Sequence, residues 1–207
     1  MGDVIYRMIM SGSIVGMIVQ ILPITCLVGI FYAVARCLFL KKRQRSVAFR
    51  PEIVKFLFVC YLAALINLVL VPNRLWTCIW AHVFLGYSGS QIGPFFVLEW
   101  NMVPTLLRYW MGELTLGSWV KTMLVGNVLL FVPLGFFWPL VISKGKRCRV
   151  WILAVAVPIV IELIQPIIGR SFDLDDILCN MLGIFIGYGI FWVLKSAAPG
   201  WVQKYRS

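Results

Sequence analysis

Acidic residues and histidine are scarce in this sequence. Of its 207 residues, eight are Asp or Glu, and His82 is the single histidine. One histidine excludes a metal site built from several histidines of the same chain. The six cysteines form no C-x-x-C pair, so the sequence predicts neither a zinc cluster nor a disulfide framework. The signatures of P-loop NTPases, serine hydrolases and zinc proteases are missing as well.

Charge of either sign is also rare, and long apolar runs take its place. Charged residues make up 13% of the chain and hydrophobic residues 61%, whereas a soluble domain is roughly one quarter charged and about half apolar. Runs of about 20 apolar residues are typical of membrane-spanning helices. The sequence therefore predicts an all-α polytopic transmembrane bundle with five spans, at residues 13–40, 53–72, 119–142, 151–168 and 177–195.

The net charge of +11 is distributed unevenly, and its pattern indicates topology. Fourteen of the 19 Lys and Arg residues lie in or beside the 41–55 loop, in the loop after the third span, or in the C-terminal tail. The positive-inside rule places these segments in the cytoplasm and the N-terminus outside. No basic stripe with interleaved aromatic residues lies apart from the spans, so nucleic acid is not expected as a partner.

Loop 73–118 is long, apolar and aromatic, with stretches such as "LWTCIWAHVFLGY" and "IGPFFVLEW". We expect it on the outer side, lying along the membrane surface with its Trp and Tyr side chains at headgroup level. A short re-entrant hairpin is the alternative, if protein shields its backbone.

Polar residues within and beside the last four spans gather at one depth. At about 1.5 Å per residue, Asn67, Asn127, Glu162 and Asn180 lie roughly 6–9 Å below the outer ends of their spans. The outer loop "GRSFDLDD" adds further polar groups just above them. Because polar side chains are costly in lipid, we predict a ligand-binding cluster. Its members are Asn127, Glu162, Gln165, Arg170, Asp173, Asp176 and Asn180.

Spacing suggests the role of single residues in this cluster. Asp173, Asp176, Asn180, Gly183 and Gly187 form one stripe if the last span begins near Asp173, and the two glycines would let a neighbouring helix approach. Asp175 points off this stripe and is expected to be solvated.

Structural alternatives stay open for several of these residues. Glu162 either pairs with Arg170 or handles a ligand or proton, and Asp173 is either a ligand contact or the helix N-cap. Asn67 and Asn127 either belong to the cluster or simply hydrogen-bond between helices.

Four motifs resemble the VanZ-like family of integral membrane proteins. They are "WNMVPT", "GNVLLFVPLGF", "IELIQ" and "GRSFDLDDILCNMLGIFIG", which together span residues 98–195. One departure is Thr105, where the family usually has Phe after N-x-x-P. Beyond the cluster, the resemblance carries over the structural positions Asn101, Pro104, Pro133, Gly135 and Gly183.

The resemblance also implies a division of the chain and a setting. Residues 1–52 would be an added span with a basic cytoplasmic loop, 53–195 the family's membrane domain, and 196–207 a cytoplasmic tail. The family implies a multi-pass protein of the bacterial cell membrane, and its namesake is linked to tolerance of the glycopeptide teicoplanin.

Three functions fit these observations. The first is a protein that binds an envelope lipid or a glycopeptide-type ligand in an outward-facing polar pocket. The second is an intramembrane enzyme, with Glu162 as general base and Asp173 and Asp176 holding Mg²⁺ or Ca²⁺. The third is a lipid or small-molecule transporter built around proline-broken spans. Outside the enzymatic alternative, no metal and no cofactor is expected.

Overall fold

The five predicted spans are all present as helices in the computed structural model, which describes residues 7, 14–43, 49–71, 73–86, 100–113, 115, 117–142 and 150–205. The helices that are long and apolar enough to cross a membrane lie within five elements. These are α2 (Ile14–Lys42), α3 (Phe49–Leu70), α6 (Ser118–Val141), α7 (Val150–Ile164) with the 3₁₀ turn η1 (Gln165–Ile168), and α8 (Leu174–Ala197).

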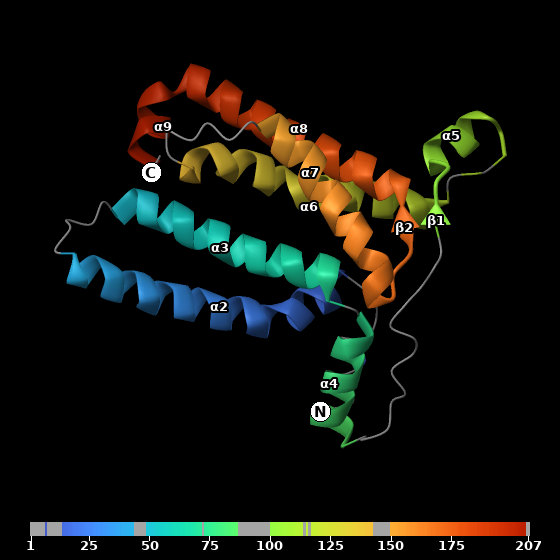
Figure 1. Cartoon of the computed structure of the whole chain (residues 1–207), viewed down its shortest axis with the longest axis horizontal. Coiled ribbons are helices and arrows are strands. Elements are labelled where there is room, and N and C mark those ends of the chain that lie inside the picture. Colours follow the sequence, from blue (N-terminus) through green and yellow to red (C-terminus); the bar gives the residue numbers. More distant parts are fainter. Residues whose placement is uncertain are drawn as a thin grey trace.

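Helices α6 and α8 make the most extensive contact of the bundle, with α7 packed mainly on α8 and α3 on α6 (Figure 1). Phe131 of α6 and Ile184 of α8 are among the most deeply buried side chains. Tyr61 of α3 donates a hydrogen bond from its hydroxyl to the carbonyl of Leu130, 2.8 Å away, and so ties α3 to α6. Close van der Waals packing, with this polar contact, holds the four helices together.

Helix α2 lies at the edge of the bundle and packs chiefly against α3 (Figure 1). Most of its long apolar side chains are exposed, including those of Leu27, Ile30 and Phe31. In a membrane protein such exposed side chains contact lipid tails, which are as apolar as the side chains themselves.

The predicted loop 73–118 contains several short elements. Helix α4 (Asn73–Leu85) turns away from the bundle directly after α3 (Figure 1). Residues 87–99 lie outside the described part of the chain. Strand β1 (Trp100–Asn101) and helix α5 (Thr105–Trp110) follow.

Two residues of β1 pair with the chain just before α8, which the predicted all-α fold does not include. Strand β2 (Phe172–Asp173) runs parallel to β1, with Trp100 opposite Phe172 and Asn101 opposite Asp173. The rings of Trp100 and Phe172 are 5.0 Å apart. This pairing brings the first and last of the family-like motifs together at one end of the bundle (Figure 1). At the opposite end, α9 (Pro199–Tyr205) packs back on α8 and α3.

Candidate functional site

The seven residues predicted as a cluster come from elements that meet where α7 ends and α8 begins. Asn127 lies on α6, Glu162 at the end of α7, and Gln165 in η1. Arg170 follows η1, Asp173 lies in β2, and Asp176 and Asn180 occupy the first two turns of α8. The candidate site is thus assembled from both sides of a single sharp reversal of the chain.

That reversal depends on two residues with special backbone properties. Pro166 lies at the start of η1, where its missing N–H leaves no hydrogen bond unmade. Gly169 has a φ of 81°, a left-handed conformation that a residue with a Cβ adopts only with strain. The Arg170 N–H then donates to the Gln165 carbonyl at 3.0 Å and closes the turn.

Glu162 is completely buried, and its carboxylate is engaged by the chain on the other side of the reversal. Its Oε2 accepts a hydrogen bond from the Asp173 main-chain N–H at 3.1 Å. The Gln165 amide is oriented so that its nitrogen donates to both Glu162 oxygens, at 2.9 and 3.1 Å. The reverse orientation would place the amide oxygen against these carboxylate oxygens, which are also acceptors. These partners offset part of the cost of burying a carboxyl group.

Arg170 contacts α3 instead of Glu162. Its Nη1 donates to the carbonyls of Leu68 and Val69, at 3.3 and 3.0 Å. Carbonyls in the last turn of a helix lack partners within the helix, and a cation there also complements the helix dipole. No ion pair joins Glu162 and Arg170, both of which lie in the described part of the chain. That alternative from the sequence is therefore wrong.

Asp173 is the N-cap of α8 and also binds the β1 segment. Its Oδ1 accepts a hydrogen bond from the Asp175 N–H at 2.9 Å, which satisfies one of the helix's unpaired N–H groups. Its Oδ2 accepts from Asn101 Nδ2 at 3.1 Å. One carboxylate thus starts the helix and holds the paired strand in register.

The prediction that Asp175 is solvated is wrong. Asp175 is only 3% exposed, and its Oδ2 accepts a hydrogen bond from the Thr105 main-chain N–H at 2.6 Å. The segment from β1 to α5 covers the face of α8 on which Asp175 lies. The spacing of polar residues along α8 does not predict that another segment packs there. Because the donor is a backbone group, Thr105 makes the contact although the family usually has Phe at this position.

Asp176 and Asn180 complete the cluster on α8. Asn127 Nδ2 of α6 donates to Asp176 Oδ1, so these two helices are joined by an amide and a carboxyl group. Asn180 is 3% exposed. Its Oδ1, like Oδ1 of Asp175, has no hydrogen-bond partner among the residues that the structure describes.

Glycines set the separation of α6 and α8 just beneath this cluster. A Cβ built on Gly183 would overlap the carbonyl of Val128, and one on Gly187 would overlap that of Val132. A Cβ on Gly135 would likewise overlap the carbonyl of Ile184. The close approach holds Asn127 within reach of Asp176. Pro133, another family position, lies inside α6.

Asn67 belongs to a different contact from the predicted cluster. Its Oδ1 accepts a hydrogen bond from Trp76 Nε1 at 3.0 Å, and both residues are buried. This bond fixes α4 against the end of α3. An Asn in an apolar span predicts a hydrogen-bond partner nearby, but the sequence does not identify Trp76 as that partner.

The arrangement of the carboxylates does not support the alternative that Asp173 and Asp176 hold a metal ion. Within the described ranges, no three His, Cys, Asp or Glu side chains are arranged so that they could hold a metal ion. Asp173 and Asp176 instead accept hydrogen bonds from Asn101 and Asn127.

Comparison with known proteins agrees with the motifs. Searches of curated proteins and of solved structures give no match. The family model described as VanZ/LLP1 matches residues 58–195, from the first half of α3 to the last turns of α8. This match covers every residue of the candidate site and leaves α2 outside it. The resemblance inferred from the motifs is confirmed, and the chain belongs to the VanZ/LLP1 family.

Proposed function

We propose that this membrane protein binds a cell-envelope lipid or a glycopeptide-type ligand through the cluster between α6, α7 and α8, on the outer side of the bacterial cell membrane. The orientation follows from the positive-inside rule, because the cluster lies at the end opposite to most Lys and Arg residues. A role in tolerance of teicoplanin would follow from such binding.

The unpaired acceptors at the start of α8 carry this proposal. Oδ1 of Asn180 and Oδ1 of Asp175 are buried and lack partners among the described residues. An unsatisfied buried polar group costs about 1–3 kcal/mol, so a donor from a ligand would recover that free energy. The neighbouring polar groups are engaged with one another and would hold the acceptors in place.

The composition of the site indicates which ligand chemistry it fits. Glu162, Asp173, Asp175 and Asp176 supply carboxyl groups, and Arg170 is the one cation beside them in the sequence. The site therefore offers acceptors to hydroxyl, amide or amine donors, which sugar and peptide headgroups carry in number. Arg170 uses Nη1 for its contact with α3. Its other guanidinium N–H groups would bind a phosphate or carboxylate of the ligand.

Replacing Asn180 by Leu tests this function directly. Leu is similar in size and removes the unpaired acceptor, so the ligand-free protein should unfold at an equal or higher temperature. The same change should abolish the stabilisation that a ligand gives. The measurement is the thermal unfolding midpoint of the purified chain in detergent, with and without teicoplanin or a lipid-linked peptidoglycan precursor.

A matched control lies on the same helix far from the cluster. Ser196 is exposed near the far end of α8, so Ser196→Ala should keep the full ligand response. If native protein gains no stability from either probe, or if Asn180→Leu responds as the native chain does, the proposed site is wrong.

A further inference from the structure

A groove lies between α2 and α3, at the end of the bundle opposite to the candidate site. It has a volume of about 520 Å³, within the range of small-molecule sites. Its walls are mainly apolar and aromatic, from Tyr32 and Ala33 on α2 and Phe49, Ile53 and Phe56 on α3. In a bilayer this groove opens toward lipid, because α2 is the outermost helix of the bundle.

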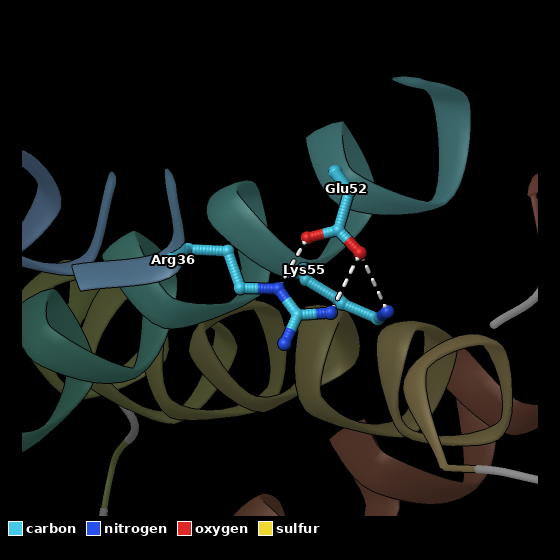
Figure 2. A network of polar contacts seen from close by, with 3 residues as sticks. All are labelled: Arg36, Glu52 and Lys55. Atoms are coloured by element: carbon cyan, nitrogen blue, oxygen red, sulfur yellow. Dashed lines mark hydrogen bonds and ion pairs between the residues drawn. The ribbon is translucent and has the colours of Figure 1, made fainter. Parts of the chain in front are cut away.

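An ion-pair network joins the two helices at the groove. Arg36 of α2 donates from Nε and Nη2 to the two oxygens of Glu52 on α3, at 2.7 and 2.9 Å (Figure 2). Lys55 Nζ binds the same carboxylate at 2.9 Å. Two cations therefore share one carboxylate, and the network carries a net positive charge. The bidentate geometry fixes the guanidinium at the groove wall.

A second cation lines the groove without a carboxylate partner. Lys41 stands in the last turn of α2, and within the described ranges no carboxylate lies at ion-pair distance from it. Arg43 and Arg50 add positive charge nearby, held over the rings of Phe39 and Tyr205. The groove thus combines an apolar wall with an unneutralised basic rim.

We infer that this groove binds one anionic phospholipid of the leaflet on the basic side of the membrane. An acyl chain would lie along Ala33, Ile53 and Phe56, and the headgroup phosphate would meet Lys41 and the outer face of Arg36. Charge complementarity selects an anionic lipid over a zwitterionic one, because each cation near the surface contributes about fivefold in affinity. Such a lipid would contact both helices and stabilise the packing of the peripheral helix α2 against α3.

Competition between two lipids with identical acyl chains tests the inference. The full-length chain, purified in detergent, is mixed with equal amounts of phosphatidylglycerol and phosphatidylcholine, and bound lipid is counted by native mass spectrometry. We expect one tightly held phosphatidylglycerol and a preference of at least about fivefold over phosphatidylcholine. Lys41→Gln should reduce this preference about fivefold, whereas Lys42→Gln, which changes a cation outside the groove, should leave it intact.

A second pair of variants tests the apolar part of the groove. Ala33→Trp fills the groove and should prevent retention of the lipid, whereas Val34→Trp adds the same side chain to the neighbouring exposed position outside it. Equal effects of the two lysine variants would show diffuse surface attraction and overturn the site. Equal retention by the two tryptophan variants would overturn it too. The lysine pair remains decisive if Ala33→Trp fails to fold.

A second copy of the chain is the competing occupant of this groove. Cys37 lines it and is exposed. In a variant whose other five cysteines are replaced by Ser, reconstituted into vesicles, efficient oxidation of two chains through Cys37 would show that a protein partner covers the groove. That result would also overturn the lipid assignment.

Discussion

Asp175 shows how one buried carboxylate can fix a distant segment of the chain. It lies in the first turn of α8, yet its partner is the main-chain N–H of Thr105, 70 positions earlier. Asp175→Ala should leave that N–H without its acceptor and destabilise the protein by about 1–3 kcal/mol. The thermal unfolding midpoint of the purified chain in detergent measures this loss of stability.

Asp175→Asn is the matched variant, because its amide oxygen can still accept from Thr105. It should be closer to the native protein in stability than Asp175→Ala. Equal stability of all three proteins would mean that the Asp175 contact contributes nothing to the fold.

The sequence indicates a residue's surroundings best where neighbouring helices determine them. Gly183 and Gly187 are expected to let some neighbouring helix approach, and the structure identifies that helix as α6, from which Asn127 contacts Asp176. The failure at Asp175 has a physical cause, since its cover comes from β1 and α5. A two-residue pairing such as Trp100–Asn101 with Phe172–Asp173 has no periodicity that a sequence could display. The sequence also does not predict the network of Arg36, Glu52 and Lys55, because charges beside a span indicate its orientation and not which of them pair.

At the scale of elements, the close contact of α6 with α8 depends on glycines, which have no side chain to keep the two backbones apart. Gly187→Ala would place a methyl group against the Val132 carbonyl, and the helices would have to separate. Overpacking of this kind costs about 1–3 kcal/mol, so the thermal midpoint should fall. Separation should also weaken the bond between Asn127 and Asp176, and with it any ligand response at the cluster.

Gly189, two residues further along the same helix, provides the control. A Cβ there would meet no atom within 4 Å. Since Ala favours a helix over Gly by up to about 1 kcal/mol, Gly189→Ala should be neutral or stabilising. If both substitutions had the same effect, close helix contact would not be what these glycines provide.

The helices themselves follow directly from the lengths of the apolar runs. Each of the five predicted spans corresponds to one helix, with ends that differ by a few residues. The start of α3 differs most, because this helix begins at Phe49 instead of residue 53. Helix α8 also begins earlier than predicted, at Leu174, because Asp173 caps it and the chain before it pairs with β1. Apolar run length therefore sets the number of spans, whereas polar contacts between distant segments set where this helix starts.

At the scale of the whole molecule, polar chemistry is divided between two ends of the bundle. Carboxyl and amide groups gather where α7 meets α8, and basic groups gather where α2 meets α3. This division suits a membrane protein whose two faces meet different headgroups and different solutes. The two proposals are independent, because the variants that test one lie far from the residues that carry the other.

The charge division also predicts which way the chain crosses the membrane. Fourteen of the 19 Lys and Arg residues should face the cytoplasm, which places the C-terminus inside and Glu113, before α6, outside. Green fluorescent protein joined to the C-terminus should fluoresce, and alkaline phosphatase at the same place should be inactive, because its disulfides form only outside the cytoplasm. Truncation after Glu113 should reverse both results. Active phosphatase at the C-terminus would invert the topology and place the acid and amide cluster on the cytoplasmic side, where an extracellular glycopeptide could not reach it.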